Sequence, residues 1–235
     1  MPAAAVGAWE RRAALCGIAF VLLFAVGLVL GAAGSVDLDG TAPEIAVRYD
    51  DNQTVLLVSE RIVVLAVFFL FAFSAGLGSA LRRAEGAGGW LPGVAVAAGA
   101  ASGVLLLVAA GFAGVEVHEG VCAHDPGASD CSGAEGSLDP GAFSLLASLN
   151  FEFLVLAAIP FAVLLAATAV VVKGTQSLPR WLGTSAGVLA VLFPIATIVK
   201  FAVLVLYVPL LAWVVAASIV LARPRDAVAE FPTRS

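Results

Sequence analysis

Charged side chains are scarce in this chain. Of its 235 residues, 12% are Asp, Glu, Lys or Arg, and 61% are hydrophobic. A soluble domain carries about 25% charged residues, so this chain has too little polar surface to keep a globule in water. Its apolar residues fall in uninterrupted blocks of about 20, the length that a helix needs to cross a hydrocarbon core of about 30 Å. The composition therefore excludes an ordinary soluble domain and indicates membrane-spanning helices.

Several motifs of known chemistry are also missing. The chain has no Walker A loop, no G-x-G-x-x-G, no H-E-x-x-H and no heme-attachment C-x-x-C-H. Charge near the middle of an apolar block, which is typical of transporters and intramembrane enzymes, is almost absent as well. We therefore expect a protein that is not an enzyme, that has no cofactor and that does not bind nucleic acid.

Six apolar blocks predict an all-α fold, a single bundle of six transmembrane helices. A backbone in lipid must satisfy its own hydrogen bonds, so each block is expected to be a helix. The predicted spans are residues 13–33, 62–81, 91–115, 147–172, 182–199 and 201–222. Residues 34–61 form outer loop 1, 116–142 form outer loop 2, and 223–235 form a cytoplasmic tail. The chain is expected to reverse near Lys200, because a continuous helix of 40 apolar residues would exceed the bilayer.

Basic residues set the orientation. Six spans place both termini on one side, and nine of the twelve Lys and Arg residues fall on that side. Cytoplasmic segments carry an excess of Lys and Arg, and Trp rings favour the membrane interface. Trp9, Trp90 and Trp181 all lie at the predicted inner interface. Both signals predict a multi-pass protein of the bacterial plasma membrane with both termini in the cytoplasm.

Acidic residues gather on the opposite side. Thirteen of the seventeen Asp and Glu residues fall in or beside the two outer loops, which gives that face a net charge of −10. A face of this charge can concentrate cations. The simpler interpretation, which we favour, is that acidic loops cross the membrane readily and stay soluble.

Outer loop 2 holds both histidines and two of the three cysteines in the stretch HEGVCAHDPGASDC, residues 118–131. Outside the cytoplasm thiols tend to pair, and Pro126 and Gly127 favour a turn, so we expect a disulfide between Cys122 and Cys131. The alternative is a metal or proton-sensing site. Its weak candidates are His118, His124, Glu119 and Asp125, with Asp130 as a further oxygen donor, although their spacing matches no zinc signature.

Four polar residues are expected to meet at the outer boundary of the membrane. Glu60 and Arg61 come directly before the second span, and Asn150 and Glu152 lie near the start of the fourth. These four residues form a candidate outer vestibule that would hold a cation or a polar headgroup. The structural alternative is an interfacial ion pair that joins two helices, because charges at the rim of the bilayer cost little.

Pairs of glycines spaced four residues apart occur in three spans. Such a pair lies on one helix face and lets another backbone approach closely. The pairs are Gly27 and Gly31, Gly99 and Gly103, and Gly183 and Gly187. We expect them to pack against other helices of the same chain.

Four stretches resemble a known group of proteins when they are taken in this order. They are PEIAVRYDDNQTVLL (43–57), FFLFAFSAGLGSALRRAEGAGGWL (68–91), SLPRWLGTSAGVLAVL (177–192) and PLLAWVVAASIVLARP (209–224). Together they resemble an uncharacterised family of small six-span integral membrane proteins from high-G+C, actinobacterial-type bacteria. The resemblance implies the span count and the cytoplasmic turns, and it implies no catalytic residue or substrate.

The sequence is compatible with three classes of function. The first is a non-enzymatic role in binding, sensing or assembly through the acidic outer face. The second is a small transporter or channel for a cation or small solute, with Glu60, Arg61 and Glu152 near its outer mouth. The third is a lipid-modifying or redox membrane enzyme. The expected partners are membrane lipids, with divalent cations or another membrane protein as further candidates.

Overall fold

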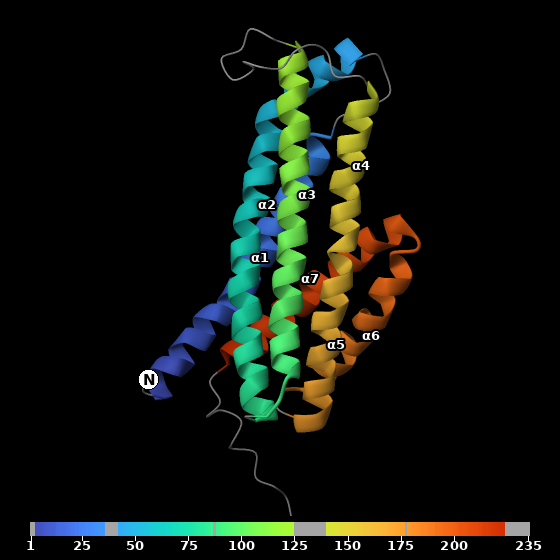
Figure 1. Ribbon diagram of the computed structural model, residues 1–235. Helices are drawn as coiled ribbons and strands as arrows, with labels where there is room; N and C mark the ends of the chain where they lie inside the picture. The colour runs from blue at the N-terminus through green and yellow to red at the C-terminus, as the bar shows by residue number, and fades with distance from the viewer. Residues whose placement is uncertain (1–2, 36–41, 87, 125–139, 177, 224–235) are drawn as a thin grey trace, which may run out of the picture.

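The computed structural model describes residues 3–35, 42–86, 88–124, 140–176 and 178–223 (Figure 1). All regular structure in these segments is α-helical. The helices are α1 (Ala3–Ala33), α2 (Ala42–Glu85), α3 (Leu91–His124), α4 (Pro140–Leu156), α5 (Ala158–Thr175), α6 (Arg180–Ala196) and α7 (Lys200–Ala222).

The α4 and α5 helices together make one pass through the bundle. They are separated at Ala157, three residues before Pro160. Proline has no backbone N–H, so the carbonyl four residues earlier loses its helical partner. In the described part of the chain, five segments are long and apolar enough to cross a membrane, and α6 is a sixth, shorter apolar helix. The predicted fold class, an all-α polytopic membrane bundle, is confirmed.

The bundle has two ends of different character (Figure 1). At the first end, which we call the basic end, α1 starts, α2 connects to α3, α5 connects to α6, and α7 finishes. At the other end, the acidic end, α1 finishes, α2 starts, α3 finishes and α4 starts. The described basic residues of the first end are Arg11, Arg12, Arg82, Arg83, Lys173, Arg180 and Arg223.

Two helices are much longer than a membrane is thick. At 1.5 Å per residue, the 44 residues of α2 extend about 66 Å and the 34 residues of α3 about 51 Å. Both rise well beyond the α6–α7 turn at the acidic end (Figure 1). Residues 42–61, expected in outer loop 1, therefore form the first part of α2, and residues 116–124 of outer loop 2 complete α3.

A small separate core explains why these extensions stay helical. Ile45 and Tyr49 on α2 pack with Val117 on α3, and all three are nearly inaccessible. Residues 45 and 49 lie one turn apart, so one face of α2 is apolar even where the rest of it is polar. The extensions therefore pair with each other at the acidic end.

The three glycine pairs pack as expected. An added Cβ on Gly27 would meet Val63 of α2, and one on Gly103 would meet Phe71 of α2. A Cβ on Gly183 would meet Val172 of α5. These glycines are therefore contact points between helices of one chain, which confirms the intramolecular prediction.

The reversal between α6 and α7 occurs slightly before the predicted position. Residues 197–199 form the turn, and Lys200 already begins α7. Pro194 lies in the last turn of α6, and the Thr197 hydroxyl donates a hydrogen bond of 2.7 Å to its carbonyl oxygen. The turn thus contains no glycine. It follows a helix end that contains Pro194, and the Thr197 hydroxyl provides a hydrogen-bond donor for the Pro194 carbonyl.

Aromatic packing joins α7 to the rest of the bundle. The buried ring of Tyr207 lies between Phe24, Phe161 and Phe193, with centroid distances of 6.0, 6.3 and 6.0 Å. Its hydroxyl donates a hydrogen bond of 2.8 Å to the carbonyl oxygen of Leu154. Farther toward the basic end, Trp213 Nε1 donates to the carbonyl of Leu182 at 3.1 Å. These contacts fix the position of α7 against α1, α4, α5 and α6.

Candidate binding pocket at the acidic end

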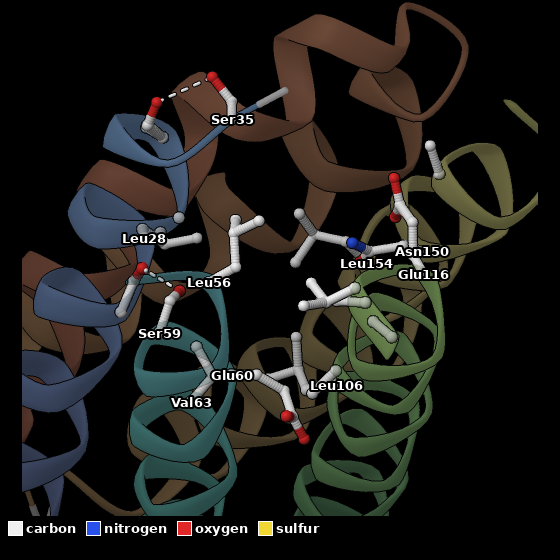
Figure 2. Close-up of a pocket in the computed structure, with 18 of the residues that line it drawn as sticks. Leu28, Ser35, Leu56, Ser59, Glu60, Val63, Leu106, Glu116, Asn150 and Leu154 are labelled. Carbon is white, nitrogen blue, oxygen red and sulfur yellow. Dashed lines mark hydrogen bonds between the residues drawn. The ribbon is translucent and has the colours of Figure 1, made fainter. Parts of the chain in front are cut away.

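A pocket of about 370 Å³ opens among the acidic-end parts of α1, α2, α3 and α4. This volume lies within the range of about 300–1,000 Å³ that is usual for small-molecule sites. The lining residues are Phe24, Gly27, Leu28, Gly31, Ala32, Ser35, Tyr49, Leu56, Ser59, Glu60, Val63, Leu106, Ala109, Ala110, Ala113, Glu116, Val117, Ala147, Asn150 and Leu154. Figure 2 shows most of them as sticks.

The deep part of the pocket is apolar. Phe24 from α1, Leu106 from α3 and Leu154 from α4 lie at this depth, and all three belong to or pack on the main core. The alanines at 109, 110 and 113 leave room along α3, because they project only a methyl group. Small residues on one helix face thus create the space, and large ones close it toward the basic end.

Polar side chains enter from three helices. Glu60 on α2 directs its carboxylate toward α3, and Asn150 on α4 directs its amide into the space between the helices (Figure 2). Glu116 on α3 lines the same pocket. No Lys or Arg is among the described lining residues, so the pocket carries two carboxylates and no lining cation.

The carboxylate of Glu60 lies in a narrow space between α2 and α3. Its side chain is only 11% exposed, and its Oε2 lies 3.7 Å from Nε of Arg61, which is 77% exposed. An added Cβ on Gly114 of α3 would lie 3.2 Å from Glu60 Oε2. Glycine at position 114 therefore leaves the room that the carboxylate occupies between the two helices.

Glu116 is the more deeply buried carboxylate, with 9% of its surface exposed. Its Oε1 accepts a hydrogen bond from the hydroxyl of Tyr49 on α2. Tyr49 is itself 3% exposed. The pair joins the extensions of α2 and α3 on the acidic-end side of the pocket, and it offsets part of the cost of burying a charge.

Ser59 of α2 joins this helix to α1 through a hydrogen bond. Its hydroxyl donates a hydrogen bond of 2.8 Å to the carbonyl oxygen of Gly27, as drawn in Figure 2. The hydroxyl also lies 3.0 Å from where a Cβ on Gly31 would be. This contact holds the ends of α1 and α2 together beside the pocket.

The structure brings together part of the predicted vestibule. Glu60 and Asn150 both line the pocket. Arg61 lies beside Glu60 but points to the surface, with 77% of its side chain exposed. Glu152 is half-buried on α4 and is not among the lining residues. Two residues of the predicted cluster, Glu60 and Asn150, therefore line the pocket, whereas Arg61 is exposed beside it and Glu152 lies elsewhere on α4.

The predicted metal and disulfide residues lie mostly at or beyond the end of α3. The exposed His118 and the buried Cys122 are one turn apart, with Nε2 and Sγ separated by 3.8 Å. Glu119 is half-buried on the same helix. Asp125, Asp130 and Cys131 lie outside the described residues, and only the backbone of His124 is described. Within the described residues, no three or more His, Cys, Asp and Glu side chains are grouped so that they could hold a metal ion. The disulfide stays a prediction.

Tyr49 and Glu116 were not among the residues predicted for this site. The signal for both is the helical period. Glu116 continues the line of Ala109 and Ala113 along α3, at spacings of four and three residues. Recognising it requires that α3 continue past residue 115, which hydropathy alone does not indicate.

One sequence pattern of an enzyme occurs elsewhere in the chain. Residues 183–187 read Gly-Thr-Ser-Ala-Gly and match G-x-S-x-G, in which the serine of a hydrolase lies on a sharp strand-to-helix turn. Here the stretch lies inside α6, and Ser185 donates a hydrogen bond of 3.1 Å to the carbonyl of Leu182. The structural context of a nucleophile elbow is therefore not met, and the two glycines pack on α5.

No known protein family, no curated protein and no solved structure matches the chain. The predicted resemblance to a family of six-span bacterial proteins thus stays a prediction, and the function must be inferred from the pocket.

Proposed function

We propose that this integral membrane protein is a non-enzymatic binding protein whose ligand site is the pocket among α1, α2, α3 and α4. We further propose that it lies in a bacterial plasma membrane with the acidic end outside the cytoplasm. The observation that carries the proposal is the pocket itself: a ligand-sized space with an apolar interior and a few convergent polar groups.

The charges of the pocket indicate the chemistry of its ligand. Glu60 and Glu116 supply carboxylate oxygens, and Asn150 supplies an amide. Carboxylates accept hydrogen bonds and attract positive charge, and hydrogen bonds to charged groups are the stronger ones. The ligand is therefore a molecule with an ammonium or similar donor group attached to an apolar part.

The closed deep end favours binding over passage. Phe24, Leu106 and Leu154, which belong to or pack on the main core, form the floor of the pocket, and Tyr207 contacts the ring of Phe24 and the backbone carbonyl of Leu154. A transported solute would have to cross this layer. Transport of the same ligand is thus the alternative that the experiment must distinguish.

The test uses dansylcadaverine, a primary alkylamine whose fluorescence rises in apolar surroundings. We expect saturable binding to the protein in nanodiscs, and affinity at least about tenfold weaker after Ala113→Leu fills the pocket or Glu60→Gln removes a charge. Ala101→Leu is the matched control, because Ala101 is exposed on the same helix outside the pocket. A dansyl carboxylate of similar length should not bind.

Two results would overturn the proposal. The first is equal binding of the amine and the carboxylate, and the second is binding that Ala113→Leu leaves unchanged. Protein-dependent flux of dansylcadaverine across proteoliposomes would replace the binding role with transport.

A further inference from the structure

The pocket is walled by helices on three sides. The α1 helix packs on α2, α2 packs on α3, and α3 packs on α4, whereas α1 and α4 make almost no contact with each other. Nearer the basic end α7 occupies this side, since Tyr207 contacts Phe24 of α1 and binds the carbonyl of Leu154 at the end of α4. Among the α7 residues whose side chains are described, from Ala202 onward, none lines the pocket. Among the described helices, none therefore closes the pocket on the side between α1 and α4, next to the place where α7 crosses.

The apolar surface beside this opening places it in contact with lipid. Leu28 lines the pocket and is also 39% exposed, so it stands at the edge of the opening. At the α6–α7 turn, Ile198 and Val199 are 82% and 62% exposed. Apolar side chains this exposed are stable when lipid tails cover them.

Helix lengths give the depth of the opening. The 17 residues of α6 extend about 26 Å, so its turn lies close to the far boundary of a hydrocarbon core about 30 Å thick. Leu154 lies 19 residues, or about 28 Å, along α4 and α5 from Lys173 at the basic end. Glu60 lies about 33 Å along α2 from Arg82. The apolar floor is thus within the lipid tails and the carboxylates are at headgroup level.

A membrane amphiphile matches this pocket along the membrane normal: its apolar tail corresponds to the apolar floor, and its polar headgroup corresponds to the carboxylates and the amide. Its tail would run from the floor through the gap beside Leu28 into the leaflet, and its headgroup would reach Glu60, Asn150 and Glu116. A space of about 370 Å³ is too small for the two acyl chains of a lipid, so the chains must remain outside it. The described lining has carboxylates and no Lys or Arg, and Arg61, which pairs with Glu60, is directed to the surface; such a lining favours an ammonium headgroup over an anionic one.

We propose that the ligand is a membrane amphiphile with an ammonium headgroup, which reaches the pocket sideways from the acidic-end leaflet through the opening between α1 and α4. This inference rests on the proposed binding function, and it adds the source of the ligand and its route.

The experiment measures displacement of dansylcadaverine from protein in nanodiscs. Hexadecylamine, hexadecanol and hexadecanoate are each titrated over the same range of mole fractions in the lipid, and butylamine is titrated from water. We expect hexadecylamine to displace the probe at mole fractions at least tenfold lower than hexadecanol or hexadecanoate. Glu60→Gln should reduce this preference for the amine to less than threefold.

The route is tested at the edge of the opening. Leu28→Trp should raise the hexadecylamine fraction needed for displacement at least fivefold, and it should raise the butylamine concentration needed by a clearly smaller factor, because butylamine has no tail that must pass this edge. The control is Leu22→Trp, on an exposed part of α1 that does not line the pocket. Each variant is checked for folding by its monodispersity in detergent.

The outcomes separate the two proposals. If butylamine displaces the probe but hexadecylamine does not, the pocket binds a soluble cation, and the amphiphile proposal is wrong while the binding function stands. If hexadecanol displaces as well as hexadecylamine, the headgroup assignment fails. If dansylcadaverine shows no saturable binding at all, the binding function fails with it.

Discussion

The hydroxyl of Tyr207 on α7 donates a hydrogen bond of 2.8 Å to the carbonyl oxygen of Leu154, in the last turn of α4. Leu154 lines the pocket, and Tyr207 packs under Phe24, which lines it as well. This one contact connects the floor of the binding site to α7, the helix that begins beside its opening.

Replacing Tyr207 with Phe should weaken this connection and leave the ring packing intact. We expect Tyr207→Phe to lower the free energy of unfolding by about 0.5–1.5 kcal/mol, the net worth of one such bond in water or in a bilayer. The measurement is unfolding by added SDS in mixed micelles. Val205→Ala, at a position 70% exposed, is the control and should change stability by less. Equal stability of Tyr207→Phe and wild type would show that the bond contributes nothing.

Tyr49 and Glu116 should be energetically coupled. Tyr49→Phe leaves a buried carboxylate without that donor, and we expect a loss of about 1–3 kcal/mol of stability. Glu116→Gln keeps an acceptor and should cost less. The double variant should then be less destabilised than the sum of the two, with a coupling energy of about 0.5–3 kcal/mol. Additive effects in a thermal-unfolding cycle would show that the two side chains do not interact in solution.

Close packing of α1 on α2 requires a glycine at position 76. An added Cβ there would lie 2.6 Å from Cβ of Ala13, which has no rotamer to move away. We expect Gly76→Ala to destabilise the protein by about 1–3 kcal/mol through overpacking. The matched control is Gly111→Ala on α3, where nothing lies within 4 Å and alanine should stabilise the helix by up to about 1 kcal/mol. Similar SDS-unfolding midpoints for both variants would contradict this packing.

The membrane-embedded part of the fold could be predicted because lipid constrains it strongly. A backbone in hydrocarbon must form helices, so the apolar runs predict the passes, and Arg82 with Arg83 marks the end of α2. The glycine pairs were predictable for a similar reason, since small residues on one face imply a close neighbour. In both cases a local pattern is sufficient.

The helical extensions of α2 and α3 and the pocket could not be predicted from local sequence patterns. Water does not require residues 42–61 to be helical, and their polar composition resembles a loop. The pairing of Tyr49 with Glu116 spans 67 residues and depends on how α2 and α3 are aligned. The opening depends on where α7 crosses, which rests on contacts of Tyr207 with three other helices. Sequence patterns within one helix do not contain these relationships.

Both termini should lie in the cytoplasm. The basic residues at the ends of α2, α5 and α7 favour that side. A fluorescent protein fused after Ser235 should fluoresce, because it folds only in the cytoplasm, and alkaline phosphatase fused there should be inactive. Alkaline phosphatase inserted after Ser35, at the acidic end of α1, should be active and serves as the control. Activity of the C-terminal phosphatase fusion would reverse the orientation or change the number of passes.

Cys122 and Cys131 should form a disulfide if the acidic end lies outside the cytoplasm, where thiols are oxidised. Cys16 on α1 has a free thiol. Alkylation of the denatured chain without reductant should therefore modify one cysteine, and alkylation after reduction should modify all three. Mass spectrometry of the intact protein counts the added groups directly.

The disulfide should raise the free energy of unfolding by about 2–3 kcal/mol, so a Cys131→Ser variant should unfold at lower denaturant concentration. Three modified cysteines before reduction would show that the bridge is absent, and the oxidising location of the acidic end would lose its chemical support.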